Sequence, residues 1–438
     1  MRVAHFSDLH YAGAQLTEVD RCFSFAVDAA IAHGVDCAVI SGDSTDHALE
    51  VHAPAVEALA RNIRRLADHC PVLMLQGTFS HEPPGALNVF RLLGGRFRVH
   101  VADRLQQVAL RDDCCWRESQ GWRFEQIPPS ARAVFSCVPT VNKAVIAAAV
   151  GATEASAAVG EQLTTLLQGF APCNAAARAA GVPTIGVSHG TVYGCVTEHG
   201  VPMAGFDHEF TTGSLFGAAA QAFLLGHIHK HQSWEQDGRV IAYAGSIGRL
   251  HYGEQGDKGF LIWEVEAASV RFELIATPAK RTVEISFDGM PRLEELQQIA
   301  RTNDVTGAFV RVRWTMPEED RHEVDRSAIQ GIFGTAAEVK LEGRVIPVVR
   351  TRAAGISQEA TIAAKIALWA RLTEARAEPL LACLEALQTR APEEIAANIM
   401  ERAIEAPRAI PAAAESDTDA LAETTADAAA LPLLVEAP

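Results

Sequence analysis

The sequence predicts a layered α/β fold, in which helices cover sheets of mostly parallel strands. Three observations favour this class. Short apolar runs alternate with helical patterns over residues 1–277, and the chain opens with a strand, a helix and a second strand. Small polar clusters also follow directly after five of the predicted strands. Because α/β sheets bind ligands at the carboxyl ends of their strands, these clusters are the first candidates for a functional site.

The predicted strands are short and apolar, and turn or polar residues end them. They are Val3–Phe6, Cys37–Ile40, Val72–Leu75, Val134–Val138, Thr184–Val187, Ala222–Leu225, Val240–Tyr243 and a hairpin over Phe260–Ile275. Apolar residues at helical spacing predict a helix over Leu16–His33, with Gly34 at its C-terminal cap. Further helices are predicted over 51–67 and over the alanine-rich stretch 144–180.

The pattern changes near Pro278. Strands predicted at Thr282–Phe287, Phe309–Trp314 and Val339–Val349, with helices between them, indicate a small α+β module. Residues 357–405 are helical in pattern, and we expect Pro379 to interrupt them. The last segment has too few apolar residues to bury and is predicted to be disordered. The expected domains are therefore 1–277, 278–352, 353–406 and an acidic tail at 407–438.

Composition excludes several classes of protein. The 438 residues are 48% hydrophobic and carry 38 basic against 54 acidic side chains, a net charge of −16. This balance argues against a surface that coats nucleic acid, although a local basic groove remains compatible with it. We find no apolar run of the ~18 residues that a membrane span requires. The nine cysteines include no CxxC pair, which is typical of thiols in a reducing compartment. We therefore expect a cytoplasmic protein that does not contact membranes.

The polar clusters after the strands combine carboxylates with imidazoles. They are Asp8–His10, Gly42–Asp46, Gly77–Glu82, Ser188–Gly190 and Gly226–His229. In an extended segment residues i and i+2 point the same way, so Asp8 and His10, or His227 and His229, can converge on one point. Alternatively, the two members of a pair can reach adjacent ions. A carboxylate such as Asp43 can bridge two cations about 3.5–4 Å apart. Mixed imidazole and carboxylate ligands suit Mn, Fe or Zn better than Ca or Mg.

Each fragment alone is common, but the whole ordered set resembles the motifs of calcineurin-like metallophosphoesterases: Asp-x-His, Gly-Asp-x-x-Asp, Gly-Asn-His, Gly-His and Gly-His-x-His. The runs VAHFSDLH, GHIHKHQSW, YAGSIGRLHYGE and DKGFLIWEV look more specifically like the SbcD-type DNA exonucleases. That resemblance implies a four-layer α/β/β/α metallophosphoesterase sandwich, followed by a smaller α+β capping domain and C-terminal helices. It also implies two divalent cations, expected to be Mn²⁺, with Zn²⁺ or Fe²⁺ as alternatives.

The resemblance assigns roles to individual residues. One metal would be held by Asp8, His10 and His229, the other by His189 and His227, with Asp43 bridging them. His81 matches the catalytic histidine, which can protonate the leaving oxygen, and Glu82 is expected to orient it. Asp46 is interpreted as a hydrogen-bond acceptor for a metal-bound histidine rather than as a ligand.

One motif departs from the family. Gly-Asn-His is replaced by Gly-Thr-Phe-Ser-His, which lacks the asparagine that ligates the second metal. Ser80, Thr78 or water could supply the missing oxygen, with Ser80 as the first choice because it directly precedes His81. We therefore expect a weaker second metal site.

Interaction surfaces are predicted less directly. Lys230 and Arg249 lie next to metal motifs, where they could contact DNA phosphates or form a solvated rim. The stripe Ile362, Ile366, Trp369 and Leu372 could bind the SMC-like (SbcC-type) ATPase that accompanies this family, or pack on the chain's own core. The chain has no phosphate-binding loop of its own, so an ATPase would be a separate polypeptide. A homodimer is a further assembly consistent with the resemblance.

The expected function is metal-dependent hydrolysis of DNA phosphodiesters in repair or recombination. The resemblance implies a 3′–5′ exonuclease with single-strand endonuclease activity. A small-molecule phosphodiesterase or phosphomonoesterase is the alternative that the negative charge favours. A binding subunit with weakened catalysis is a second alternative, suggested by the lost asparagine.

Overall fold

The computed structural model describes residues 1–47, 49–93, 95–140, 152–197, 200–201, 210–252, 254, 256–347 and 355–405. The predicted disordered tail at 407–438 lies outside these residues. The chain forms two compact units, Met1–Val348 and Val349–Pro438. Among the described residues, no helix is both long and apolar enough to cross a membrane.

A six-stranded sheet contains the first three predicted strands. Its order is β13 (Val270–Ala276), β12 (Gly259–Val265), β1 (Arg2–Phe6), β2 (Cys37–Ile40), β3 (Val72–Leu75) and β4 (Val99–Ala102). Strands β1 to β4 are parallel, and the β12–β13 hairpin joins β1 antiparallel. Helices α1 (Leu16–Ala32) and α2 (Pro54–His69) connect the parallel strands. All four residues of β2 and of β3 are buried, which explains why these strands read as continuous apolar runs.

A seven-stranded sheet contains the remaining strands of this region. Its order is β10 (Gln232–Gln236), β11 (Arg239–Tyr243), β9 (Ala222–Gly226), β8 (Thr184–His189), β7 (Ala131–Val138), β5 (Gln106–Arg111) and β6 (Trp116–Glu118). The central strands β7, β8, β9 and β11 are parallel, whereas both edges pair antiparallel. Helices α4 (Ala152–Ala179) and α5 (Thr212–Gly217) accompany this sheet.

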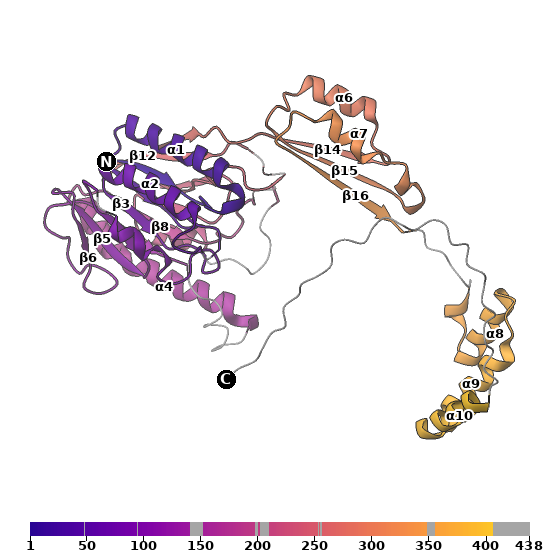
Figure 1. Cartoon of the computed structure of the whole chain (residues 1–438). Coiled ribbons are helices and arrows are strands. Elements are labelled where there is room, and N and C mark those ends of the chain that lie inside the picture. The colour runs from indigo at the N-terminus through magenta and orange to yellow at the C-terminus, as the bar shows by residue number, and fades with distance from the viewer. Residues whose placement is uncertain are drawn as a thin grey trace. The chain divides into compact units, whose positions relative to one another are not determined.

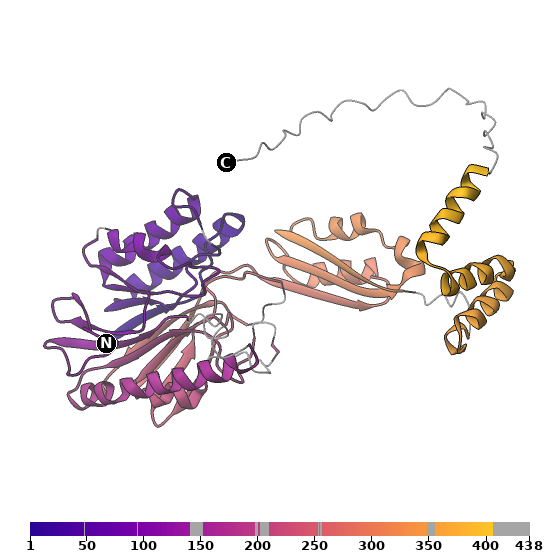
Figure 2. The ribbon, with the colours of Figure 1, turned by 90° about the horizontal axis from the view of Figure 1, so that it is seen from below.

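The two sheets pack face to face around a shared apolar core. Val39 and Leu73 of the first sheet belong to the same buried cluster as Phe135 and Val187 of the second. The outer face of the six-stranded sheet is covered by α1 and α2, and α4 and α5 cover the other sheet. Figures 1 and 2 show this sequence of layers. The predicted four-layer α/β/β/α sandwich is therefore confirmed.

A smaller sheet follows the sandwich. Strands β14 (Thr282–Asp288), β15 (Phe309–Pro317) and β16 (Glu338–Ile346) are parallel, with α6 (Leu293–Thr302) and α7 (Arg326–Ile332) in the connections. Both helices pack on one sheet face, where Val310, Val312 and Trp314 are buried. The predicted α+β module is thus a parallel βαβαβ unit. The domain boundaries proposed from the sequence stay predictions.

The second unit holds three helices, α8 (Ile362–Leu372), α9 (Ala377–Thr389) and α10 (Pro392–Glu405). Pro379 was predicted to interrupt them, but it lies in the first turn of α9, where a missing backbone N–H costs nothing. The break between α8 and α9 falls instead at Thr373–Arg376, where Glu374 has φ +57°.

Candidate metal centre

The loops after β1 and β2 bring the first two polar clusters together. Backbone hydrogen bonds join Asp8 N to the Gly42 carbonyl (3.2 Å) and His10 N to the Asp43 carbonyl (3.0 Å). The two loops therefore run side by side beyond the sheet edge. Candidate ligands from β8 and β9 reach the same edge, because these strands end in the same direction in the facing sheet.

Three side chains form a first group of candidate ligands, which we call cluster one: Asp8, His10 and His229. Their ligand atoms all lie within 4.8 Å of one another. The Nε2 atoms of His10 and His229 are 3.1 Å apart, and His10 Nε2 is 4.0 Å from Asp8 Oδ1. Both ring nitrogens thus face one point beside the carboxylate.

A second group, cluster two, contains Asp43, His189 and His227. His189 Nε2 lies 3.2 Å from Asp43 Oδ2, and the rings of His189 and His227 are 5.2 Å apart between centroids. The Asp8 carboxylate accepts hydrogen bonds from the backbone N–H of His227, at 3.0 and 3.1 Å. Asp8 therefore connects the two clusters, because it belongs to cluster one and binds the main chain of His227 in cluster two.

The backbone at these positions is not extended. Asp8, His10 and Asp43 have φ of +50°, +51° and +51°, and His227 has φ of +103°. The sequence argument that i and i+2 residues converge because they lie on a strand is therefore wrong in its reason. Asp8 and His10 do meet in cluster one, whereas His227 and His229 belong to different clusters. Non-glycine residues with positive φ are uncommon and cluster at functional sites, where the surrounding structure holds them.

Glycines permit the close approach of these loops. Gly42 has φ +105°, and a Cβ there would collide with the His189 ring. At Gly77 a Cβ would collide with the backbone nitrogen and the carboxylate of Asp43. Neither position can therefore carry a side chain without moving a candidate ligand.

The donor set fits divalent cations. Imidazoles that bind metal through Nε2 normally donate from Nδ1 to a carbonyl or carboxylate. His189 Nδ1 lies 2.8 Å from the Ser41 carbonyl, which turns Nε2 toward Asp43. Burial alone would lower the pKa of His189, but Asp43 outweighs it and raises the pKa to about 10. The negative charge that favours a proton on this ring also favours a divalent cation in its place.

Thr78, rather than Ser80, lies against the ligands of cluster two. Its hydroxyl is 3.1 Å from Asp43 Oδ2 and 3.2 Å from His189 Nε2, and its backbone N–H donates to Asp43 Oδ1 at 2.6 Å. Ser80, the first choice from the sequence, is exposed. The two extra residues of the loop push Ser80 outward, so position in the motif was a poor guide to position in space.

His81 is held by Asp46 instead of Glu82. Its Nδ1 is 3.0 Å from Asp46 Oδ1, and its ring lies 4.9 Å from that of His10. The backbone N–H of His47 donates to the same nitrogen at 3.3 Å, which places the proton of the neutral ring on Nε2. Asp46 accepts from Nδ1 only when both ring nitrogens carry a proton. Burial lowers the pKa of His81. The ring is therefore oriented with Nε2 left for a substrate.

Glu82 does not orient His81 as predicted. Its buried carboxylate accepts the backbone N–H groups of Ser44 and Gly77, both at 2.5 Å. It thereby ties the loop after β2 to the loop after β3. Burial, together with Asp43, raises the pKa of Glu82 to about 7. Its role in the structure is to hold the two loops that carry Asp43 and Thr78.

Asp46 faces three histidines, and its carboxylate forms a further group of candidate ligand atoms with His10 and His81, all within 4.8 Å of one another. Its role as a hydrogen-bond acceptor stays a prediction. Besides His81, its Oδ1 lies 2.8 Å from His47 Nδ1 and 3.9 Å from His10 Nδ1. Because His10 directs Nε2 toward the other members of cluster one, Asp46 faces the opposite ring nitrogen, Nδ1. Contact with His10, opposed by partial burial, lowers the pKa of Asp46.

Two further residues were missed from the sequence. Glu254 and Lys258 form a buried ion pair of 2.6 Å behind His229, and Glu254 Oε1 is 3.6 Å from His229 Nδ1. Burial alone would raise the pKa of Glu254, but His229 and Lys258 lower it to about 2. Both lie in runs quoted for the family resemblance, and the signal was a charged pair four residues apart beside the start of an apolar strand.

The predicted phosphate-binding residues are placed differently. Two guanidinium nitrogens of Arg249 donate to the carbonyls of Lys280 (2.6 Å) and Gly256 (2.7 Å). These hydrogen bonds use two of the five guanidinium N–H donors, so a contact of Arg249 with a DNA phosphate stays a prediction. Lys230 is half-buried directly after His229, and its contact with DNA stays a prediction.

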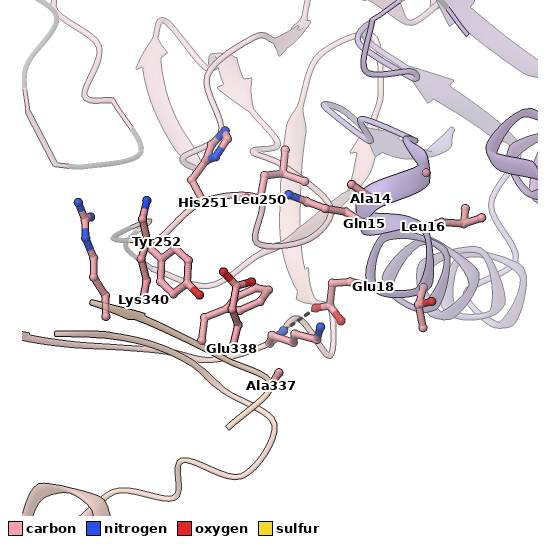
Figure 3. A pocket seen from close by; sticks show the side chains of 15 residues that line it. Ala14, Gln15, Leu16, Glu18, Leu250, His251, Tyr252, Ala337, Glu338 and Lys340 are labelled. Atoms are coloured by element: carbon pink, nitrogen blue, oxygen red, sulfur yellow. Dashed lines mark hydrogen bonds between the residues drawn. The ribbon is translucent and has the colours of Figure 1, made fainter. Parts of the chain in front are cut away.

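Two hollows open at this edge. The first, of about 360 Å³, is lined by members of both clusters together with Thr78, Asp46 and His81. The second, of about 730 Å³, shares Ala14, Gln15, Leu250 and His251 with the first. It continues to the small parallel sheet, where Lys340 and Glu338 line it along with Tyr252 (Figure 3). The candidate metal centre therefore opens into a larger groove.

Comparison with known proteins agrees with the metal centre. No protein-family model matches the sequence. The chain is 32% identical over 89 residues to the uncharacterized metallophosphoesterase YhaO of Bacillus subtilis, and the match spans 20% of each protein. Among solved structures it is similar to GAP50 of Plasmodium (12% identity, 63% of this chain and 84% of that one, TM-score 0.40). It is also similar to a dimetal phosphatase of Danio rerio (11%, 63% and 98%, TM-score 0.37).

Structural similarity at these TM-scores says nothing about activity. The sequence match to YhaO covers one fifth of that protein, so it does not show the activity, substrates or partners of this chain. The sequence match is to a protein described as a metallophosphoesterase, and the ligand clusters are of the residue types expected from the resemblance to that superfamily.

Proposed function

We propose that this chain is a two-metal phosphoesterase that hydrolyses DNA phosphodiesters, as a 3′–5′ exonuclease with single-strand endonuclease activity in repair or recombination. One observation supports it above the others. Two clusters of metal-ligating side chains lie at one sheet edge, and an oriented histidine, His81, stands beside His10. Carboxylates and imidazoles in such pairs suit divalent cations that act on phosphate esters.

The proposed division of labour follows the geometry. Two cations, proposed to be Mn²⁺, would supply positive charge to the phosphate and lower the pKa of water. Cluster one would hold one cation, and cluster two with Thr78 would hold the other. His81, when both of its ring nitrogens carry a proton, gives the Nε2 proton to the leaving oxygen, and Asp46, 3.0 Å from Nδ1, stabilises the charged ring. Glu82 holds together the two loops that carry Asp43 and Thr78 by accepting a backbone N–H from each.

The larger groove supports a polymeric substrate. A single nucleotide needs little more than the hollow of about 360 Å³ at the clusters, and the adjoining hollow is about twice that volume. Lys280, Arg311 and Lys340 line it, and Phe309 and Tyr252 add aromatic surface. Cations beside aromatic rings are the usual surface for single-stranded nucleic acid. We infer that the strand beyond the cleaved bond lies there.

A small phosphodiester or phosphomonoester is the second candidate. The basic side chains of the small sheet are paired: Arg311 donates to Glu342 at 2.9 and 2.7 Å, and Lys340 Nζ is 3.1 Å from the same carboxylate. Such pairing, with the net charge of −16, lowers the attraction for a polyanion. A small substrate would need the clusters alone.

The test is a parallel assay with Mn²⁺ on 5′-end-labelled linear DNA and on a bis-aryl phosphodiester, with Asp43→Asn as the control for contaminants. We expect progressively shortened labelled DNA, which the control protein does not produce. Immediate release of labelled mononucleotide would contradict the 3′–5′ direction. Turnover of the small diester alone, also after addition of a candidate ATPase partner, would replace the proposal with the small-substrate enzyme.

The groove has its own test. Lys280→Ala with Lys340→Ala should lower kcat/KM on DNA, and each lost phosphate contact should reduce the salt dependence of binding by about one unit of slope. Turnover of the bis-aryl diester should be unchanged. Arg292→Ala, an exposed residue of the small sheet's unit that pairs with Glu295, is the matched control. Equal losses on both substrates would place the two lysines outside DNA binding.

We also propose a protein partner of the SMC-like (SbcC-type) ATPase class, bound by α8, and a cytoplasmic location. Ile362, Trp369 and Leu372 are 58%, 37% and 48% exposed, so the predicted stripe is not buried within its own unit. An exposed apolar helix face is the usual means of binding a partner helix. Trp369→Glu should abolish co-purification with such an ATPase and leave bis-aryl diester turnover unchanged. A homodimer remains the other assembly to test by light scattering.

A further inference from the structure

A buried polar network lies directly behind His229 and outside both ligand clusters. Lys258 and Glu254 are 3% and 2% exposed, and their charged groups are 2.6 Å apart. Glu254 also accepts the backbone N–H groups of His251 (3.2 Å) and Leu250 (3.4 Å). The network therefore joins the loop after β11 to the start of β12.

The same network reaches His229 from two sides. Lys258 Nζ donates to the His229 carbonyl at 2.8 Å and to the Ser246 hydroxyl at 2.9 Å. Glu254 Oε1 lies 3.6 Å from His229 Nδ1, a buried ring nitrogen that has no hydrogen-bond partner within 3.5 Å among the described residues. His229 is thus held at its main chain by the lysine and faced at its ring by the carboxylate.

Stability alone does not account for a pair in this place. Desolvating two charges costs about as much as their attraction returns, and apolar residues of similar volume often serve equally well. A buried ion pair that contacts a particular side chain has a further consequence, because it restricts that side chain to a single orientation. Here the arrangement directs His229 Nε2 to within 3.1 Å of His10 Nε2.

We propose that Glu254 is a positioning residue for His229. Its carboxylate faces Nδ1 at 3.6 Å, so its charge favours the tautomer that carries the proton there, leaves Nε2 unprotonated, and raises the basicity of Nε2 toward a cation. Lys258 holds the carboxylate and the His229 main chain in place. The inference rests on the proposed function in one respect, namely that cluster one binds a metal ion.

The experiment measures Mn²⁺ binding to the full chain by isothermal titration, with and without substitution. Glu254→Gln keeps the shape of the side chain and removes its charge. We expect the affinity of one of two sites to fall about 10–100-fold while the other site is unchanged, since loss of such an outer partner typically has this size. Glu266→Gln, an exposed carboxylate near the same hairpin, should bind as the unsubstituted protein does.

A second variant covers the case in which Glu254→Gln does not fold. Glu254→Asp keeps the charge that Lys258 requires and withdraws it from His229 by one methylene, so it should fold and weaken the same site by about tenfold. Unchanged affinity at both sites in either folded variant would overturn the inference, as would an equal loss at both sites.

The result is separable from the fate of the proposed function. If the unsubstituted protein binds two Mn²⁺ ions but cleaves neither DNA nor the bis-aryl diester, the function fails and the selective effect of Glu254→Gln still supports the positioning role. If it binds no Mn²⁺, both are overturned.

Discussion

The two ligand clusters differ in what stands behind their histidines. In cluster one, both outer ring nitrogens face carboxylates: His10 Nδ1 is 3.9 Å from Asp46, and His229 Nδ1 is 3.6 Å from Glu254. In cluster two, His189 Nδ1 faces the Ser41 carbonyl at 2.8 Å, and the Thr78 hydroxyl lies 3.2 Å from His189 Nε2. A carboxylate makes an imidazole a stronger ligand than a carbonyl does. Cluster one should therefore bind its cation more tightly.

The largest expected effect comes from the residue that serves both clusters. Asp8 is a candidate ligand of cluster one and accepts the His227 backbone N–H for cluster two. Asp8→Asn should reduce bound manganese at both and lower phosphoesterase activity about 10³-fold or more, the several kcal/mol that a bound cation contributes. Metal content by mass spectrometry and diester turnover check this. Asp28→Asn, in a surface ion pair with Arg65, is the control. Loss at one cluster only would mean that Asp8 does not couple them.

The next effect separates catalysis from metal binding. His81→Ala should lower kcat by about 10²–10⁴-fold, because it removes the proton donor. Both clusters remain, so metal content should be unchanged. Steady-state kinetics on the bis-aryl diester, together with metal analysis, distinguish the two quantities. Equal activity in the variant would take His81 out of the mechanism.

His100, a buried histidine outside the clusters, shows how the pKa of a histidine depends on the carboxylate beside it. Burial lowers the pKa of His100 to about 4, and Glu118, 3.8 Å away and partly exposed, offsets this only in part, whereas Asp43 raises the pKa of His189. Since the folded pKa of His100 lies below the unfolded value of 6.5, its contribution to stability is complete above pH 6.5. It should be lost as the pH falls toward 4, by about 2 kcal/mol at pH 5. Denaturant unfolding at pH 7 and pH 5 should show this loss in the unsubstituted protein and not in His100→Gln.

The smallest expected effect concerns Thr78, whose hydroxyl lies beside Asp43 and His189 in cluster two. Thr78→Asn restores a longer neutral oxygen donor beside Asp43 and His189, so it should tighten the weaker manganese site by about tenfold without changing the stronger one. Titration calorimetry on the two proteins compares the affinities. A variant whose weaker site does not change would show that the oxygen at position 78 has no part in metal binding.

Sequence reasoning predicted the buried strands and the residues that meet at their ends. Strands such as β2 and β3 are continuous apolar runs, and their following clusters converge as expected. It missed β4 and β5, which are buried but whose apolar pattern is interrupted by His100 and by Gln106 and Gln107. It also missed β6 and β10, because an edge strand such as Gln232–Gln236 has mostly half-exposed or exposed residues and shows little apolar pattern. The polar sequence there resembles a loop.

Within the site, errors arose where the conformation of a loop decided the outcome. The insertion after Gly77 exposes Ser80 and brings Thr78 to Asp43, and Glu82 turns to two backbone N–H groups instead of His81. Glu254 and Lys258 could not be assigned because charged residues are usually exposed, and only packing shows this pair to be buried. Residue type identified the ligands, whereas their hydrogen-bond partners required the fold.

Titration of the unsubstituted, metal-free protein with Mn²⁺ tests most directly whether the site binds two cations unequally. We predict two binding events per chain, the tighter one lost in His10→Ala and the weaker one strengthened in Thr78→Asn. Two sites of equal, tight affinity, or a single event that His10→Ala leaves intact, would contradict the account.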